Sequence, residues 1–439
     1  MAMQGFTRTL GIAALLLIVF IVTTIADPNF IGSDNLYNIL RWSAFYGVLA
    51  LGVAFVIITG GIDLSIGSVV ALSGITLMIL LQVDYKDSGT DLTIAGVDKE
   101  TKTLQLVEDM PAYSNLDRLA VPNPGGADDI LLTIDAAQTE QLNDSRSVVV
   151  RENVSRISPG DVGGLQAQSR LMNPWLAVLL TLLLGTAIGV FHGLLIGYGG
   201  MQPFIITLCG LLAYRSLARI ISNDEVITIG SHHGSLRYLS GGQPFEIPVP
   251  FIGRIGNASD EAARGFLGWV PMPMPMLTLL ILALISGVLL HKMVHGRYML
   301  AMGRNLEAAR FSGINTRRVT LTAYVICSTL AALGGILFAL DLGAVTPATD
   351  GNFYELYAIA AAVLGGCSLR GGVGSIRGVI LGTIVIITLY SMINFLGKSS
   401  EWRDLIIGVV LLLGIAADEL GRKVYSSIKT RQRRKKLSG

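Results

Sequence analysis

The sequence predicts an all-α polytopic membrane protein with about ten transmembrane helices and a small, β-rich extracytoplasmic insert. The chain has 439 residues, of which 51% are hydrophobic and only 15% are charged. A soluble protein typically carries about 25% charged residues. Several apolar runs of about 20 residues carry almost no charge, and this is the length that a helix needs to cross a bilayer. The short alternating segments of a membrane β-barrel are not apparent in the sequence.

The expected spans follow the apolar runs in chain order. Arg8 precedes the first run, Leu10 to Val22, so a signal peptide is an alternative for this segment. The residues "TTIADPNF" that follow make a poor cleavage site, and we therefore expect a retained first helix. The spans are expected at residues 10–26, 43–60, 63–82, 172–198, 203–221, 273–294, 318–341, 354–368, 375–396 and 402–420.

The distribution of charge predicts the orientation of these spans. The tail, residues 422–439, contains eight Lys or Arg residues and no acid. The loop at 295–318 carries five arginines against the single acid Glu307. Both segments are expected in the cytoplasm by the positive-inside rule. With an even number of spans the N-terminus is cytoplasmic as well, and residues 83–170 lie outside.

The segment 83–170 is long enough to form a small domain. It holds 15 acids and 8 bases, which suits the outer side of the membrane. The stretches "TIAGVDKETKTLQLVED" and "LLTIDAAQTEQLNDSRSVVVREN" read as short strands separated by turn residues. A disordered loop is the alternative. The predicted organisation is therefore spans one to three in 1–82, the insert in 83–170, spans four to ten in 171–421, and the basic tail in 422–439.

The stretch "ITGGIDLSIGSVVALSG", Ile58 to Gly74, predicts a break between the second and third spans. Gly60 and Gly61 can end one helix, and Asp63 and Ser65 can satisfy the free amides that open the next. An acid inside a membrane segment is a functional candidate by default, yet an acid at a helix start can also be a simple cap. Both interpretations stay open for Asp63, and they stay open for Glu355, which follows the loop "TPATDGNFY".

The cytoplasmic stretch "NLEAARFSGI" predicts a short helix. Asn305 can cap its N-terminus, Glu307 lies in its first turn, and Gly313 can end it. One interpretation is a helix lying on the membrane surface. The other is a docking element for a cytoplasmic partner.

Other kinds of chemistry find little support in the sequence. It contains no phosphate-binding loop of the G-x-x-x-x-G-K-[ST] type, so if the protein does work that needs energy, the energy comes from elsewhere. Cys209, Cys327 and Cys367 are expected to be small packing residues. The histidines lack metal-ligand spacing, and we expect them at membrane interfaces or on the surface: His192, His232, His233, His291 and His295.

Three motifs carry a resemblance to a known family. They are "GGIDLSIGSVVALSG", "GRNLEAARFSGIN" and "YELYAIAAAVLGGCSLRGGVGSIRGVILG", and they occur in the family's order. The chain, apart from about Val83 to Arg170, resembles the permease subunits of bacterial ATP-binding cassette importers for monosaccharides such as ribose, xylose and galactose. Two departures stand out, since the family usually has a short loop in place of the insert and more often has Thr at the position of Cys367.

The resemblance implies a bacterial inner-membrane permease that acts as a pair of identical copies. Two ATPase subunits would dock from the cytoplasm, and a periplasmic sugar-binding protein would deliver a monosaccharide from outside. ATP and Mg would be held by the ATPase, this chain would bind no cofactor and no nucleic acid, and it would not itself be an enzyme. The resemblance further implies a coupling loop that contacts the ATPase through Gly303, Asn305, Glu307, Ala308, Ala309, Ser312 and Gly313.

The same resemblance implies a gate or translocation path built from the glycine-rich motifs: Gly60, Gly61, Asp63, Ser65, Glu355, Gly365, Gly366 and Ser368. Sparse charge within the spans fits a neutral sugar, which needs no buried counter-ion. A ribose-type pentose is the first expectation, with Ser73, Gln202 and Asn394 as further candidates to line the path. The alternatives are an ion-coupled secondary sugar transporter and a membrane receptor or scaffold that uses the acidic insert.

Overall fold

In the computed structural model the described residues are 2–111, 118–123, 129–142, 144–170, 172–229, 234–250, 267–397 and single positions between 402 and 412. They form two compact units. The helical unit comprises Met1–Ile79, Val178–Thr228 and His233–Gly439. The insert unit comprises Leu80–Ala177 and Ile229–His232.

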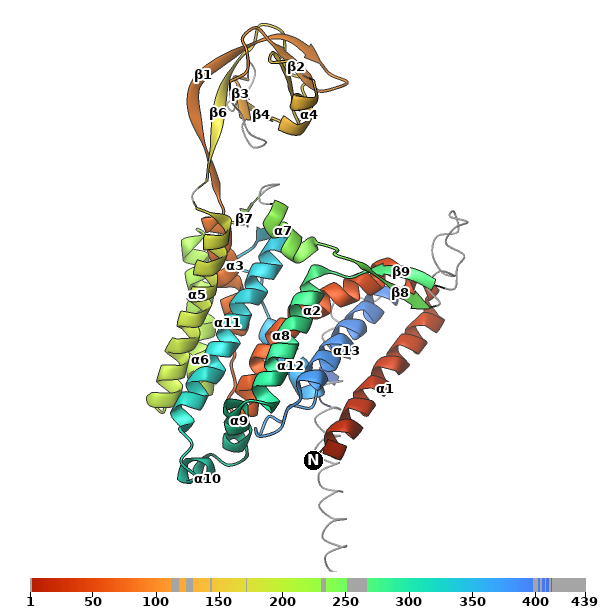
Figure 1. Cartoon of the computed structure of the whole chain (residues 1–439), viewed down its shortest axis with the longest axis vertical. Helices are drawn as coiled ribbons and strands as arrows, with labels where there is room; N and C mark the ends of the chain where they lie inside the picture. Colours follow the sequence, from red (N-terminus) through yellow and green to blue (C-terminus); the bar gives the residue numbers. More distant parts are fainter. Residues whose placement is uncertain are drawn as a thin grey trace, which may run out of the picture. The chain divides into compact units, whose positions relative to one another are not determined.

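Figure 1 shows the order of the elements along the chain. The long and half-length apolar helices are α1 (Ala2–Ala26), α2 (Ser33–Ile58), α3 (Ile66–Leu80), α5 (Pro174–Gly193), α6 (Pro203–Ile221), α8 (Met274–His291), α11 (Thr316–Leu342), α12 (Tyr354–Leu364) and α13 (Ile376–Phe395). Shorter helical elements are η1 (Pro28–Ile31), the π-helical turn η2 (Leu194–Tyr198), α7 (Gly234–Gly241), α9 (Val294–Arg304) and α10 (Leu306–Phe311). Two strand pairs accompany them: β7 (Ile227–Thr228) with β10 (Ala344–Val345), and β8 (Glu246–Pro250) with β9 (Leu267–Pro271).

Six helices within the described residues are long and apolar enough to cross a membrane: α2, α5 with η2, α6, α8, α11 and α13. Gly11–Ala26, α3 and α12 are shorter apolar helices. The tenth expected span, 402–420, and the basic tail, 422–439, lie almost entirely outside the described residues. The count of ten spans therefore stays a prediction.

The predicted start of the second span was wrong, because α2 begins at Ser33 rather than near residue 43. The polar first turns of this helix lie before the apolar run and were therefore not part of the predicted span. In the structure these polar groups are satisfied by neighbouring helices. Arg41 forms an ion pair with Asp341 of α11 at 2.7 Å, and the side chain of Asn35 accepts a hydrogen bond from Ser391 of α13 at 2.6 Å.

Helix α2 forms the centre of the helical unit. The 18-residue apolar stretch of α2 is 83% buried, and the helix packs against α8, α11, α12 and α13. Helices at the perimeter are less buried than α2, since only 17% of the apolar stretch of α6 is buried. Leu212 and Ile220 of α6 are strongly exposed, as are Leu284 of α8 and Leu183 of α5. Such apolar faces suit contact with lipid or with another copy of the chain.

Residues 83–170 contain a six-stranded antiparallel sheet in the order β4-β3-β6-β1-β2-β5. Its strands are β1 (Val83–Asp98), β2 (Thr103–Leu106), β3 (Arg118–Val121), β4 (Ile130–Thr133), β5 (Ser147–Val149) and β6 (Val162–Arg170), with the short helix α4 (Ala136–Gln141). Leu92, Ile94, Leu104, Leu132 and Val148 belong to one buried apolar cluster. The segment therefore has a hydrophobic core of its own.

Small residues allow α5 and η2 to approach α11 closely. Gly185, Gly189, Gly193 and Gly197 recur every four residues and lie on one face. A Cβ atom at Gly189 would lie 2.6 Å from the Cα of Val325, and one at Gly193 would lie 2.6 Å from the Cα of Leu321. The stripe thus marks backbone contact between these helices, where a side chain has no room.

Replacing Gly189 with Val should destabilise this packing. We expect the variant to lose about 1–3 kcal/mol of stability, the usual cost of overpacking, and to melt at a lower temperature in detergent. Gly287 of α8 has open space where a Cβ would lie, so Gly287→Val serves as the matched control. Equal melting temperatures for the Gly189→Val and Gly287→Val variants would contradict the close packing.

Candidate functional site

The helical structure is interrupted between α2 and α3, where residues 61–65 form neither helix nor strand. Helix α2 ends at Ile58, Gly60 has a φ of 86°, and α3 begins at Ile66. The Oδ1 atom of Asp63 accepts hydrogen bonds from the backbone amide of Ser65 at 2.9 Å and from its hydroxyl at 2.6 Å. Both side chains are fully buried. Asp63 therefore fixes the backbone immediately before α3.

A buried polar cluster surrounds this break. The hydroxyl of Tyr324 on α11 donates to the carbonyl oxygen of Ile62 at 3.1 Å. The hydroxyl of Tyr214 on α6 lies 2.9 Å from the Nε2 of His192 on α5. Within the part of the chain that the structure describes, Asp63 Oδ2 and His192 Nδ1 have no hydrogen-bond partner. The break is thus held by a side chain of α11, and a second polar contact joins α5 to α6.

The expectation that His192 lies at an interface or on the surface was wrong. Its side chain is fully buried. The space for the ring comes from Gly210 on α6, because a Cβ there would lie 2.8 Å from His192 Nε2. The sequence signal was available, since His192 interrupts the glycine stripe of α5 and so faces a neighbouring helix.

Glu355 lies in the first turn of α12 and is 8% exposed. Its carboxylate lies against Gly67 in the first turn of α3, where a Cβ would collide with Glu355 Oε2 and with the carbonyl oxygen of Gly351. The starts of α3 and α12, separated by almost 300 residues of chain, are therefore brought together. Asp63 and Glu355 both belong to this region, each next to a helix start.

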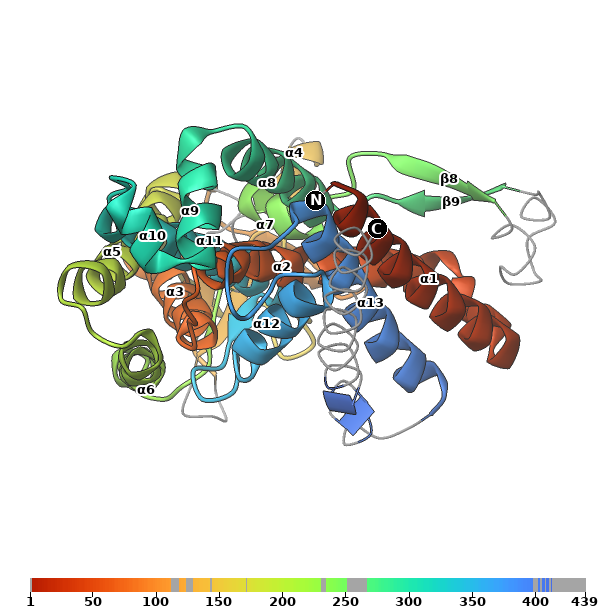
Figure 2. The ribbon, with the colours of Figure 1, turned by 90° about the horizontal axis from the view of Figure 1, so that it is seen from below.

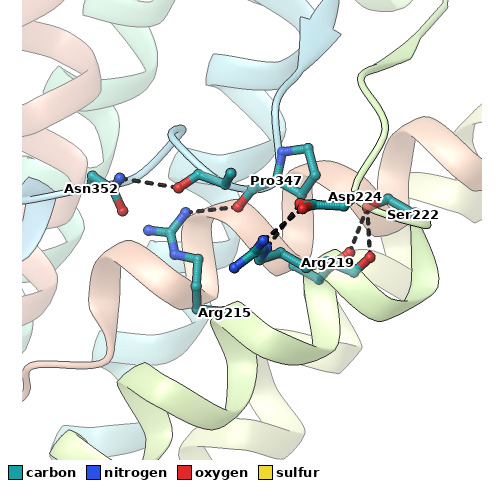
Figure 3. A network of polar contacts seen from close by, with 8 residues as sticks. Arg215, Arg219, Ser222, Asp224, Pro347 and Asn352 are labelled. Carbon is teal, nitrogen blue, oxygen red and sulfur yellow. Dashed lines mark hydrogen bonds and ion pairs between the residues drawn. The ribbon is translucent and has the colours of Figure 1, made fainter.

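An arginine holds the loop between α11 and α12. Arg215 of α6 donates to the carbonyl oxygen of Pro347 at 3.1 Å (Figure 3). It also donates to the carbonyl oxygen of Asp350. One turn further along α6, Arg219 forms an ion pair with Asp224 at 2.6 Å, and this contact holds the pKa of the Asp224 carboxyl below its usual range. The C-terminal end of α6 is therefore tied to the loop between α11 and α12 and to the turn that follows α6 itself.

The end of α2, the end of α9 and the α12–α13 turn meet, and we call this contact the glycine junction: Ile58, Gly60, Gly303, Gly371 and Gly372. The amide of Gly372 donates to the carbonyl oxygen of Ile58 at 2.8 Å. A Cβ at Gly303 would collide with that same oxygen and with the amide of Gly372. A Cβ at Gly371 would lie 2.8 Å from the carbonyl oxygen of Gly303 and 3.1 Å from the Cα of Gly60. The contact is therefore between backbones.

The turn between α12 and α13 shapes one side of this junction. Gly365 packs against Gly378 of α13, and Gly366 has a φ of 92°. The amide of Gly371 donates to the carbonyl oxygen of Ser368 at 2.8 Å, and the amide of Ser368 donates to Val373 at 3.0 Å. Three predicted path residues thus form one tight turn, which places the neighbouring Gly371 in the junction.

The predicted coupling residues lie on α9, α10 and the turn that follows. The side chain of Asn305 accepts a hydrogen bond from the amide of Ala308 at 2.9 Å and so caps α10, while Gly313 has a φ of 80° after its end. Ala309 is buried, and Ser312 bonds back to the carbonyl oxygen of Ala308 at 2.8 Å. Helix α9 was not expected, because the only helix predicted within the loop 295–318 was the short one beginning at Asn305.

Sequence reasoning missed the most exposed apolar side chain of α10. Phe311 is 90% exposed, and Leu306 on the same short helix is 56% exposed. A phenylalanine in this position has little to contact within the described residues of its own chain. The pattern of the sequence cannot show this, because six residues are too few to distinguish a core-facing stripe from an outward-facing one.

The comparison with known proteins agrees with this arrangement of apolar helices. The sequence profile of the family described as "Branched-chain amino acid transport system / permease component" matches residues 35–415. The chain belongs to this permease family. With its six long apolar helices, it is a multi-pass membrane protein of the permease class.

Relatives similar over nearly the whole chain include three sugar permeases. The ribose import permease protein RbsC of Bacillus subtilis (strain 168) is 29% identical over 417 residues, or 94% of both chains. RbsC of Escherichia coli (strain K12) is 28% identical, covering 93% of this chain and 92% of its own. The xylose transport system permease protein XylH of the same strain is 26% identical, covering 94% and 91%. No solved structure matches the chain.

Substitutions at Asp63 separate capping from charge. Asp63→Asn keeps an oxygen that can accept the Ser65 bonds, so we expect thermal stability in detergent close to that of the wild type. Asp63→Ala removes the acceptor and should cost about 1 kcal/mol or more, as loss of a cap does. Equal melting temperatures for the Asn and Ala variants would show that the bonds to Ser65 contribute nothing to stability.

Proposed function

We propose that this chain is the membrane-spanning subunit of an ATP-binding cassette importer and forms the path for a monosaccharide. The observation that carries the proposal is the glycine junction. Through it, the element that bears α10 touches the α2–α3 break and the α12–α13 turn by direct backbone contact. A displacement of α10 is therefore transmitted to the α2–α3 break and to the α12–α13 turn, the two parts of the predicted gate, without a flexible linker.

The relatives favour a sugar over an amino acid as the substrate. Ribose and xylose appear in the names of permeases that align over more than nine-tenths of this chain, whereas the family description refers to branched-chain amino acids. A pentose of the ribose type is the first candidate. Such a sugar is neutral, so recognition needs hydroxyl and amide groups rather than buried counter-ions. Ser73, Gln202 and Asn394 stay candidates to line the path.

The ATPase is a separate cytoplasmic chain in this proposal, and it holds ATP and Mg. Phe311 and Leu306 provide an exposed apolar contact on α10, which suits insertion into a pocket of that partner. The remaining predicted coupling residues act by shape: Gly303 belongs to the glycine junction, Asn305 and Ser312 cap α10, and Gly313 turns the chain. Glu307 is exposed in the first turn, where a carboxylate is also favourable for the helix.

The orientation of the chain follows from the charge pattern. The arginine-rich segment 295–318 and both termini lie in the cytoplasm of a bacterial cell, and residues 83–170 lie in the periplasm. A periplasmic sugar-binding protein then approaches from the side of the insert. The exposed apolar faces of α5, α6 and α8 leave room for lipid and for a second copy of the permease.

Reconstitution tests the proposal against its alternatives. The permease is placed in proteoliposomes with candidate ATPase and sugar-binding subunits, and uptake of labelled ribose is measured with and without ATP. We expect uptake that requires all three components and ATP. Uptake by the permease alone, driven by an ion gradient, would instead support a secondary transporter. Sugar-independent binding of another protein, without uptake, would support a receptor or scaffold.

Replacing Phe311 with Asp should weaken docking of the ATPase. Removal of an apolar anchor from a partner's pocket typically costs about 2–4 kcal/mol, so we expect at least a roughly tenfold loss in co-purified ATPase and in ATP-driven uptake. Val107→Asp changes an exposed apolar side chain in the insert and serves as the control. Normal ATPase binding by Phe311→Asp would refute a docking role for this side chain.

A further inference from the structure

Phe353 has an unusual backbone conformation for an aromatic residue. Its φ is 63° and its ψ is 4°, in the left-handed region, and it immediately precedes α12. Asn223 and Asp224 share a positive φ, but short polar side chains tolerate it far better than a bulky ring does. The ring of Phe353 is 62% exposed, so burial of the side chain does not compensate for the strain.

Contacts on several sides hold the loop in this strained form. Arg215 binds the carbonyl oxygens of Pro347 and Asp350, and the carboxylate of Asp350 accepts from the amide of Thr346 at 2.8 Å. Gly351 is packed so closely against Gly67 that a Cβ on either would collide with the backbone of the other. Strain that the surroundings maintain in this way is characteristic of functional positions.

The tip of this loop is apolar on its open side. The amide group of Asn352 is turned back to donate to the carbonyl oxygen of Ala348 at 3.1 Å, as Figure 3 shows. Leu356 lies three residues after Phe353, about one helical turn further, and is 51% exposed. The two exposed side chains therefore make a small apolar surface, and Tyr354 and Glu355 between them face inward.

This apolar surface lies where two half-length helices begin. Glu355, in the same helical turn, contacts the first turn of α3 at Gly67. Figure 2 shows α3 and α12 along one edge of the helical unit, between α6 and α13. Discontinuous helices whose starts meet inside the bundle are a recurrent way of building a transport path.

We propose that Phe353, supported by Leu356, is an apolar gate that closes the sugar path between transport cycles. This inference rests on the proposed function. An apolar constriction excludes water and ions because it dewets when it is narrow. Movement of α12 opens the gate, and the other end of α12 leads directly into the turn that forms the glycine junction.

The test uses the complete transport complex in proteoliposomes loaded with labelled ribose, without ATP. Phe353→Ala should leak sugar at least about tenfold faster than the wild type, because the constriction is widened. Phe353→Leu keeps most of the apolar bulk and should leak within about twofold of the wild type. The control is Phe191→Ala, which removes a 54%-exposed phenylalanine from α5 and should leave the liposomes tight.

A second measurement covers the case in which Phe353→Ala fails to fold. Phe353→Cys in a Cys209→Ser background, which removes the exposed native thiol, should react with a membrane-impermeant thiol reagent more rapidly during ATP turnover than at rest. Cys327 and Cys367 are buried and need no change. A tight Phe353→Ala complex with normal uptake, or a Phe353→Cys variant whose labelling rate ATP does not change, would overturn the gate. Lack of ATP-driven uptake by the wild type would instead refute the proposed function.

Discussion

Close contact between backbones at the glycine junction is the constraint on which the rest of the helical unit depends. Gly303 and Gly372 allow the end of α9 and the α12–α13 turn to lie on the last carbonyl group of α2, with no side chain between them. Backbone contacts cannot yield by changing a rotamer, so displacement of one loop must displace the others. The arrangement links α9, and through it α10, with the helix break at Gly60.

A second constraint comes from the interior of the membrane, where polar groups need partners within the protein. The break between α2 and α3 meets this need through Asp63, Ser65 and Tyr324, and the loop before α12 meets it through Arg215. These contacts come from α6 and α11 as well as from the break itself. The irregular backbone is therefore possible only within this particular packing of helices.

Local patterns in the sequence were enough to predict the elements that depend on neighbouring residues. Asn305 and Gly313 mark the two ends of α10, and Gly60 marks the end of α2. These positions are predictable because helix capping and a positive φ depend on the local sequence. Contacts between distant segments were not predictable in this way. The burial of His192, the clamp from Arg215 and the exposure of Phe311 each depend on where a different helix lies. The start of α2 was misplaced for the same reason, since Asp341 pairs with Arg41 from far along the chain.

The most direct test of the account is a Gly303→Val permease assembled with its ATPase and sugar-binding subunits. ATP hydrolysis, ATPase co-purification and sugar uptake are measured on one preparation, with Gly287→Val as the control. We predict that the ATPase still binds, because α10 and Phe311 are unchanged. Uptake per ATP hydrolysed should fall at least about tenfold, because overpacking separates the three segments of the glycine junction. Unchanged uptake per ATP in a folded Gly303→Val complex would contradict a role for the glycine junction in coupling.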